Sequence, residues 1–215
     1  NDGCIVSRTD EAKALGIQMA GPFYEAKEIL AKHDVAVFSS NYHLYGDMSW
    51  RVMETLRMLC QQVEVYSVDE SFVDLDGIEE SAMWDYGLHI RNTVERWTGI
   101  PVSVGIAPTK TLAKVANHMA KKNKKATQGT VALITADEIH EALENLPVQQ
   151  VWGVGFRSAE KLRWLGIDTA WKLRNMSEEW ANKNLGGVVG KRLIKELHGQ
   201  PCRDMKDPLQ KKNMI

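Results

Sequence analysis

Two adjacent carboxylates interrupt a stretch of the sequence that is otherwise typical of β-strands. Asp69 and Glu70 stand inside Val65–Leu75, between two short runs of valine and aromatic residues. One interpretation is a hairpin turn whose two acids face water. The other is a metal site, because adjacent carboxylates at the end of a stiff strand can hold a divalent cation against phosphate oxygens. The pair by itself leaves both interpretations open.

A glycine-containing turn is predicted further along the chain, within Val148–Leu162. Its two glycines are separated by one apolar residue, and the apolar spacing around them predicts a helix-hairpin-helix. Glycine has no Cβ, so the backbone N–H groups of such a turn and of the next helix can face a phosphate. A plain helix end with a terminal glycine is the alternative. The predicted phosphate-binding residues are Gly153, Val154, Gly155, Arg157 and Lys161.

A weaker copy of the same pattern stands at Leu185–Leu193, where glycines again precede basic residues. Its predicted DNA contacts are Gly190 and Lys191. Contacts of this kind hold the DNA backbone without reading the bases.

Three lysines, Lys110, Lys114 and Lys121, are four and seven residues apart and therefore share one face of a predicted helix. We interpret this face as a contact to DNA or to another phosphate, with a solvated basic surface as the alternative. The segment has no Gly-x-x-x-x-Gly-Lys-Ser/Thr loop, so any phosphate would be held by lysine point charges.

Hydrophobic periodicity predicts the elements that must position these residues. The order of strand, hairpin, helix, strand and helix indicates an α+β fold with helices on one face of a sheet. A domain boundary between Ile139 and Pro147 precedes a basic tail of short helices. The expected helices are Thr9–Leu15, Pro22–Lys32, Leu44–Leu59, Ser81–Thr98 and Thr109–Lys121, and the expected strands are Val35–Phe38, Val63–Val68, Phe72–Leu75 and Val102–Ala107.

Composition narrows the class of protein. The chain has 215 residues, of which 44% are hydrophobic and 26% charged, as in ordinary globular proteins. No apolar run is long enough for a membrane span, and no segment resembles a signal peptide, so we expect a cytoplasmic protein. The three cysteines form neither a disulfide framework nor a zinc pattern.

Charge is segregated along the chain although the net charge is only −1. Residues 54–95 carry ten acids and two basic residues, whereas residues 101–130 carry six lysines and no acid. Residues 147–215 carry thirteen basic residues against seven acids. The distribution predicts one block that attracts cations and two that attract a polyanion.

Taken together, these motifs resemble those of the Y-family (translesion) DNA polymerases, and in particular their UmuC type. The segments Ser67–Ser71 and Gly105–Ala107 are similar to motifs that mark the family. The segments Phe38–Tyr42 and Val151–Gly155 are similar to motifs of the UmuC type. The resemblance extends over essentially all of the chain.

The resemblance implies roles for individual residues. Asp69 would bridge two catalytic Mg²⁺ ions and Glu70 would lie near the primer 3′ hydroxyl, so both are expected metal ligands. Lys13 and Lys121 match positions that hold the incoming triphosphate. Many family members have a tyrosine and an arginine where this chain has Asp10 and Lys13, so a point charge would replace a bidentate phosphate contact.

The resemblance also implies a domain organisation. Residues 1–40 would form part of the fingers, 41–140 a palm with an antiparallel sheet but without its first strand, and 141–215 a helical thumb. The missing strand would carry another metal-binding aspartate and an aromatic gate against ribonucleotides, and a little-finger domain would be absent. Because the sequence also starts without Met, we expect a truncated fragment that is inactive alone.

The implied function is error-prone translesion DNA synthesis in the SOS response to DNA damage. Its implied substrates are primed template DNA and deoxynucleoside triphosphates, and its implied partners are a UmuD′ dimer and a RecA filament, with no membrane. A DNA-binding helix-hairpin-helix module without catalysis remains an alternative. A Mg²⁺-dependent repair nuclease is another, although it needs a denser carboxylate cluster than Asp69, Glu70 and Asp74. A triphosphate cyclase with a similar palm would not need the basic tail.

Overall fold

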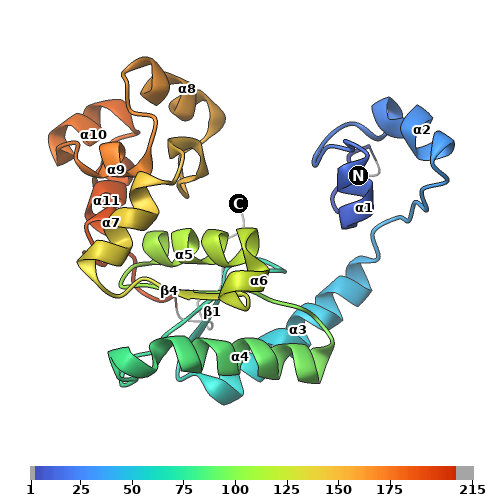
Figure 1. Cartoon of the computed structure of the whole chain (residues 1–215), viewed down its shortest axis with the longest axis horizontal. Helices are drawn as coiled ribbons and strands as arrows, with labels where there is room; N and C mark the ends of the chain where they lie inside the picture. Colours follow the sequence, from blue (N-terminus) through green and yellow to red (C-terminus); the bar gives the residue numbers. More distant parts are fainter. Residues whose placement is uncertain (1–2, 207–215) are drawn as a thin grey trace. The chain divides into compact units, whose positions relative to one another are not determined.

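The computed structural model of the chain describes residues 3–206 (Figure 1). Residues 207–215, which belong to the predicted thumb, and the first two residues of the chain lie outside the described part. The chain divides into two compact units, residues 1–47 and residues 48–215. The predicted boundaries near residues 40 and 140 stay predictions.

The first unit contains two short helices, α1 (Asp10–Ala14) and α2 (Phe23–Lys32). Thr9 caps α1 because its hydroxyl accepts a hydrogen bond from the Ala12 N–H, as the sequence predicts for a helix that starts here. A small core holds the two helices together. It consists of Ala12, Ile17, Ala26 and Leu30.

The strand predicted at Val35–Phe38 is wrong, because this segment has no regular secondary structure. Val37 is 55% exposed and Phe38 is 88% exposed, so neither side chain is covered by a neighbouring element. A strand needs a partner for its backbone groups, and no other strand occurs among the described residues of this unit. The apolar composition alone therefore does not make a strand here.

The second unit begins within α3 (Tyr42–Leu59) and contains a hairpin, a parallel strand pair and a series of helices. Its elements up to the end of the strand pair are β1 (Val63–Val65), β2 (Ser71–Val73), η1 (Glu80–Ala82), α4 (Met83–Thr98), β3 (Val104–Ile106), α5 (Lys110–Lys122), α6 (Lys124–Thr127) and β4 (Thr130–Ala132). The elements that follow are α7 (Ala136–Glu144), η2 (Val148–Gln150), α8 (Phe156–Trp164), α9 (Ala170–Arg174), α10 (Glu178–Asn184) and α11 (Val188–Leu197).

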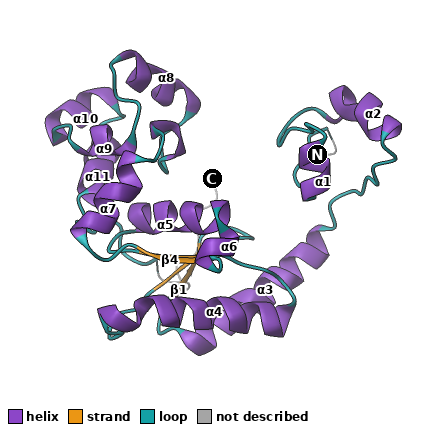
Figure 2. Ribbon diagram, viewed as in Figure 1, coloured by secondary structure: helices purple, strands orange, loops and turns teal. Residues whose placement is uncertain are grey.

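The α+β class is confirmed, but two details of the predicted sheet are wrong. The hairpin strands β1 and β2 pair antiparallel, whereas β3 and β4 pair parallel. Helices also cover both faces of the parallel pair, as Figure 2 shows, with α5 on one side and α4 on the other. Because β3 and β4 are parallel, the chain must cross over between them, and the crossover helix α5 covers one face of the pair. The preceding helix α4 covers the other face.

Two glycines allow this close packing of helices on the parallel strands. A Cβ at Gly105 of β3 would lie 2.1 Å from the backbone nitrogen of Asn117 in α5. A Cβ at Gly87 of α4 would lie 2.7 Å from a side-chain carbon of Ile106. Neither glycine has room for a side chain. Helix α5 therefore lies directly against the backbone of β3, and α4 lies against the side chain of Ile106.

One hydrophobic core joins α5 to α7, η2, α8, α9, α10 and α11. It joins Leu112 and Val115 of α5 to Leu143 of α7 and to Leu193 and Leu197 of α11. A second core joins α3, α4 and the hairpin. The predicted palm and thumb segments therefore share buried contacts rather than lying apart.

A buried carboxylate fixes the N-terminus of α5. Glu196, on α11, is 1% exposed, and its Oε2 accepts a hydrogen bond of 3.1 Å from the Thr111 N–H and a second from the Thr111 hydroxyl. The Thr109 hydroxyl donates to the backbone carbonyl of Glu196 at 2.8 Å. Negative charge at a helix N-terminus is favourable, so this contact stabilises both the start of α5 and its attachment to α11.

Replacing Glu196 by alanine should therefore destabilise the second unit strongly. The change leaves the buried Thr111 N–H and hydroxyl without an acceptor, at a cost of about 3 kcal/mol in the free energy of unfolding. Urea denaturation followed by circular dichroism measures this cost. Glu179→Ala on the exposed side of α10 is the matched control and should change the unfolding free energy by less than about 0.5 kcal/mol. Equal effects of the two substitutions would contradict this account of Glu196.

Candidate functional site

The predicted hairpin is confirmed, and it carries both acids in its loop. Val65 pairs with Ser71 at the open end of the loop, and the backbone carbonyl of Glu70 accepts hydrogen bonds from the N–H groups of Tyr66 and Ser67, each at 3.0 Å. The Ser67 hydroxyl also donates to Oδ1 of Asp69 at 2.6 Å. The loop backbone is therefore fixed, and the exposed Asp69 carboxylate can receive a ligand from solvent.

Glu70 is paired with a lysine of the neighbouring helix. Nζ of Lys114 lies 2.7 Å from Oε1 of Glu70, and the lysine side chain is only 20% exposed. The ammonium group also lies over three aromatic rings, at 5.1 Å from the ring centre of Tyr66, 5.8 Å from Phe72 and 5.7 Å from Trp152. Contacts of this kind attract a cation to the ring faces and hold the lysine in place.

The three rings pack against one another, with centres 5.6 to 5.8 Å apart. We call Tyr66, Phe72 and Trp152 the aromatic cluster. Two of its rings come from the hairpin, and the third comes from the segment just before the predicted glycine turn. The aromatic cluster therefore joins the acidic loop to the start of the thumb segment.

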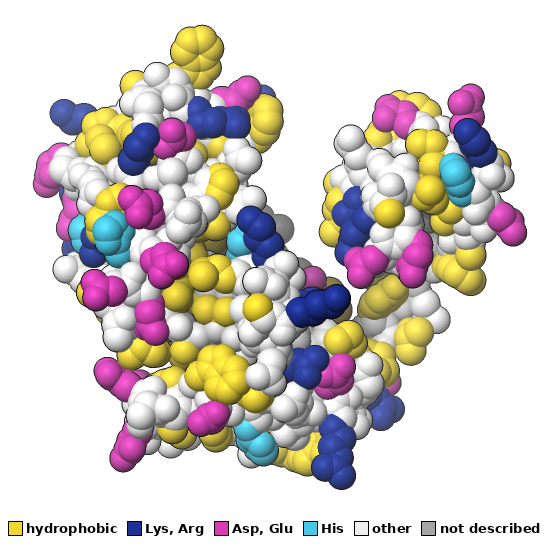
Figure 3. Space-filling view, viewed as in Figure 1, with side chains coloured by type: hydrophobic (Ala, Val, Ile, Leu, Met, Phe, Trp, Pro, Cys, Tyr) yellow, Lys and Arg dark blue, Asp and Glu magenta, His cyan; other side chains and the backbone are white. Residues whose placement is uncertain are grey.

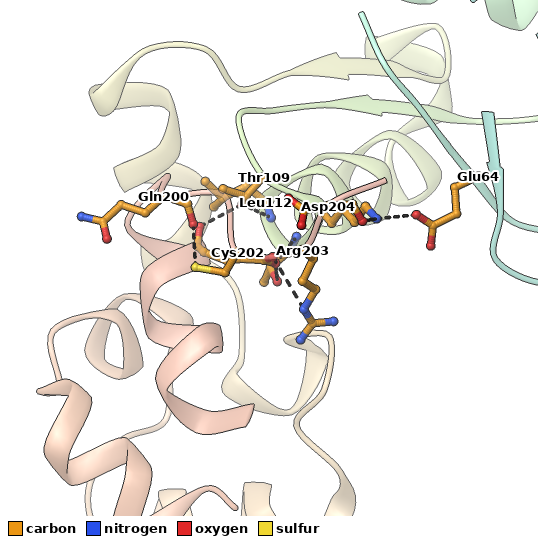
Figure 4. Close-up of polar contacts among 10 residues, drawn as sticks. Glu64, Thr109, Leu112, Gln200, Cys202, Arg203 and Asp204 are labelled. Carbon is orange, nitrogen blue, oxygen red and sulfur yellow. Dashed lines mark hydrogen bonds and ion pairs between the residues drawn. The ribbon is translucent and has the colours of Figure 1, made fainter. Parts of the chain in front are cut away.

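A second lysine of α5 is paired with a carboxylate that sequence reasoning missed. Nζ of Lys110 lies 2.5 Å from Oε2 of Glu64 and 2.9 Å from the backbone carbonyl of Asp204. Figure 4 shows Glu64 on its strand, pointing toward the segment that carries Arg203 and Asp204. Burial raises the pKa of the Glu64 carboxyl, but the hydrogen bonds and charges of Lys110 and Lys206 lower it by more. A single glutamate in a strand is typical of an outward polar position, so no local pattern indicates this pair.

The segment after α11 adds a third cation. Arg203 lies 4.3 Å from the ring centre of Trp152, and its Nε is 3.6 Å from Oε1 of Glu196. Figure 4 shows this segment running past the start of α5, where Thr109 and Leu112 lie. The same segment includes Cys202, whose sulfur donates to the Gln200 carbonyl.

These contacts divide the predicted lysine face of α5, and the alternative of a solvated basic surface does not hold for Lys110 and Lys114. The side chains of Lys110 and Lys114 are 11% and 20% exposed and are paired with carboxylates. Lys121 is exposed and forms no ion pair with any described residue. Burial lowers the pKa of the adjacent His118, and the charges of Lys122 and Lys121 lower it further. Among these lysines, Lys121 alone has the free ammonium group that a triphosphate requires.

The glycine turn of the thumb segment has the conformation that the motif predicts. Gly153 has a φ of 92°, which disfavours other residues, and the Val154 N–H donates to the Val151 carbonyl at 3.0 Å. No side chain caps the start of α8, so its first N–H groups are available to an anion beside the exposed Arg157. Lys161 is also exposed and donates weakly to the Asn184 carbonyl at 3.5 Å. The helix before the turn is shorter than predicted, because η2 has only three residues.

The second glycine motif forms a tighter helix pair. Gly186 and Gly187 have φ values of 82° and 71° and connect α10 to α11. Gly190 is buried within α11, and a Cβ there would lie 2.4 Å from the carbonyl oxygen of Ala181. Helix packing therefore explains the glycine at this position, and its presence is no sign of a DNA contact. Lys191 is half-buried.

Lys13 belongs to the first unit, whereas the other predicted site residues belong to the second. Its ammonium group is 2.7 Å from Oδ1 of Asp10, and its side chain is 51% exposed. Asp10 thus neutralises part of the charge on Lys13. A triphosphate would have to compete with this exposed pair.

The described residues contain no group of three or more histidine, cysteine, aspartate or glutamate side chains placed to bind one metal ion. Mg²⁺ is commonly held by one or two carboxylates together with substrate phosphates and water. Asp69 and the second oxygen of Glu70 fit such a partial ligand set. Over residues 3–206, no helix has the length and apolar character needed to cross a membrane.

Comparison with known proteins agrees with these observations. Residues 1–118 match the impB/mucB/samB family. The chain is 46% identical to Protein UmuC of Salmonella typhimurium over 208 residues, which cover 96% of this chain and 49% of UmuC. It is 32% identical to DNA polymerase IV of Corynebacterium diphtheriae over 206 residues, which cover 94% of this chain and 44% of that protein. The chain thus spans about half the length of these curated relatives.

The fold is similar to that of solved polymerases. The insertion ternary complex of Dbh DNA polymerase superposes with a TM-score of 0.74 at 25% identity, over 92% of this chain and 56% of that one. A Y-family DNA polymerase chimera of Dbh and Dpo4 superposes with a TM-score of 0.75 at 24% identity, over 95% of this chain and 58% of that one. The chain therefore belongs to the impB/mucB/samB family and, as its motifs predict, to the UmuC type of the Y-family.

Proposed function

We propose that these residues form the central part of a DNA polymerase that adds deoxynucleotides to a primer 3′ end, opposite damaged template bases. The observation that carries this proposal is the hairpin loop of Asp69 and Glu70, held beside the lysine-bearing helix α5, in a chain of the UmuC type. An exposed carboxylate on a fixed loop is suited to binding a cation that also contacts phosphate. The damage response context follows from the relatives and not from the geometry.

Each predicted residue has a role in this reaction. Asp69 would ligate Mg²⁺, and Glu70 would present its free oxygen near the primer 3′ hydroxyl. When bound, two Mg²⁺ ions would lower the pKa of that hydroxyl and stabilise the charge that develops on the leaving pyrophosphate. Lys121 and Lys13 would neutralise the triphosphate as point charges. The loop hydrogen bonds hold Asp69 in position before substrate arrives, so little reorganisation is needed.

The thumb segment would hold the duplex. Uncapped N–H groups at the start of α8, with Arg157 and Lys161 nearby, can bind a backbone phosphate but present no group positioned to read a base. A polymerase must bind every sequence equally, so backbone binding is the form of contact that the reaction needs. A UmuD′ dimer and a RecA filament are proposed as further partners on the resemblance alone.

A DNA-binding module without catalysis is the second candidate. It is favoured by the small number of carboxylates, because Asp69 and Glu70 alone do not complete a metal coordination shell. The nuclease alternative has less support, since it would need more carboxylates around the same loop than the described residues provide. Primer extension separates these candidates.

Asp69→Asn should abolish primer extension. The test uses the chain itself and a longer chain in which these 215 residues replace the matching half of Protein UmuC, with primed DNA, Mg²⁺ and deoxynucleotides. The amide keeps the shape of the side chain but removes its charge, and we expect a loss of at least about 100-fold in rate. Asp76→Asn, an exposed acid after β2, is the control and should extend primers normally.

Three other results would contradict the proposal in different ways. Equal extension by the Asp69→Asn and Asp76→Asn forms would exclude the role of Asp69. Binding of primed DNA without extension by either chain would favour the DNA-binding module. Cleavage of unprimed duplex would favour a nuclease.

Arg157→Ala should weaken DNA binding by the chain without regard to sequence. Loss of one phosphate contact lowers the slope of log affinity against log salt by about 1. Fluorescence anisotropy with two duplexes of different sequence, from low to moderate salt, measures this slope. Arg163→Ala, on the same helix but paired with Gln149, is the matched control and should leave the slope unchanged. A change confined to one of the two sequences would contradict backbone binding.

A further inference from the structure

Three cations and three carboxylates form separate pairs around the start of α5. Lys110 pairs with Glu64 at 2.5 Å, Arg203 with Glu196 at 3.6 Å, and Lys114 with Glu70 at 2.7 Å. The side chains of Glu64 and Glu196 are only 5% and 1% exposed, whereas that of Glu70 is 35% exposed. The carboxylates of the first two pairs are therefore buried, and the third pair alone reaches the acidic loop.

The aromatic cluster confines Lys114. A lysine side chain normally samples many rotamers, and fixing it costs conformational entropy. Here rings of Tyr66, Phe72 and Trp152 all lie within 5.8 Å of the ammonium group, so the side chain is already held before any ligand binds. A cation held in this way can fix the position of a partner carboxylate.

Glu70 needs such a partner. Its backbone is held by the N–H groups of Tyr66 and Ser67, which both donate to its carbonyl. Its side chain, in contrast, has one polar contact among the described residues, the 2.7 Å pair between Oε1 and Lys114. Oε2 is left for another ligand.

We propose that Lys114 is a positioning residue for the Glu70 carboxylate. It holds Oε1 so that Oε2 faces the place where Mg²⁺ and the primer 3′ hydroxyl would meet, and it limits the negative charge of the loop. This inference rests on the function proposed above, because it assigns the carboxylate its task. Lys114 thus acts through Glu70 and does not contact DNA, contrary to its predicted role.

Trp152 extends this arrangement to the thumb segment. Its ring contacts both hairpin rings and Lys114, and the residue directly precedes Gly153 of the phosphate-binding turn. Trp152 and Lys114 therefore form a continuous set of contacts between the Glu70 carboxylate and the turn that would hold the duplex. Replacing Trp152 by leucine removes one wall around Lys114 without removing its charge.

The first test measures the loop in the chain itself, without DNA or metal. Amide hydrogen exchange is compared for the native chain, Lys114→Met, Lys114→Arg and Lys121→Met. Methionine keeps the length and apolar stem of lysine but has no charge, and Lys121→Met changes an exposed lysine of the same helix. We expect exchange of residues 66–71 to become about 10-fold faster in Lys114→Met and to stay unchanged in Lys121→Met.

Arginine at position 114 should restore most of the protection, within about threefold of the native chain, because it keeps the charge and can stack on the rings. Unchanged exchange at residues 66–71 in Lys114→Met would overturn the inference. Faster exchange throughout the second unit would also overturn it, because it would indicate a general loss of stability.

The second test is kinetic and uses whichever of the two chains extends primers. Loss of a residue that orients a metal ligand commonly costs about 10- to 100-fold, so kcat of Lys114→Met should fall by this factor. KM for the nucleotide and the Kd for primed DNA should change by less than about twofold, because Lys114 contacts neither ligand. Lys121→Met should instead raise KM for the nucleotide.

The two tests separate failure of this inference from failure of the proposed function. Normal extension by Lys114→Met, or a fall in DNA affinity without a fall in kcat, would overturn the positioning role and leave the polymerase proposal standing. If neither chain extends primers, the exchange experiment still decides whether Lys114 fixes the loop. Rescue by Lys114→Arg in both tests is the result that the inference requires.

Discussion

The fixed N-terminus of α5 is the constraint on which the arrangement of the second unit depends. Glu196 receives the Thr111 N–H and hydroxyl in a site from which water is excluded, so the carboxylate cannot leave without a large desolvation cost to its partners. This contact joins α11 to α5. Because α5 also packs on the backbone of β3 at Gly105, the helix is held at both its start and its middle.

From this fixed start, the first two turns of α5 determine where the acidic hairpin lies. Lys110 reaches Glu64 on β1, and Lys114 reaches Glu70 in the loop, one helical turn later. The strand and its loop are thus attached to the same helix face at two points. The rings of Tyr66 and Phe72 fill the space between these points, so hairpin and helix behave as one body in which Asp69 remains exposed.

The elements and the acidic pair are predictable from the sequence, whereas the contacts between them are not. The hairpin at Asp69 and Glu70 followed from strand propensity and was confirmed, because turn and pairing are local properties. The parallel partner β4 was missed, since its pairing with β3 spans a helix and leaves no local pattern. The ion pairs of Lys110 and Lys114 leave no local pattern either. A basic helix face has the same sequence pattern whether it contacts water or carboxylates.

The ion pairs of Lys110 and Lys114 reduce the charge that the chain has available to attract a ligand. Two of the six lysines in residues 101–130 neutralise carboxylates of the acidic block, so the two blocks partly cancel inside the protein. The other four, at positions 121, 122, 124 and 125, are exposed near α6, in the region where Figure 3 shows blue side chains on the surface. Attraction for a polyanion therefore arises at the end of α5 and at the thumb turns. At the start of α5 the same residue type positions a carboxylate, so the function of each lysine depends on its partner and not on its place in a basic run.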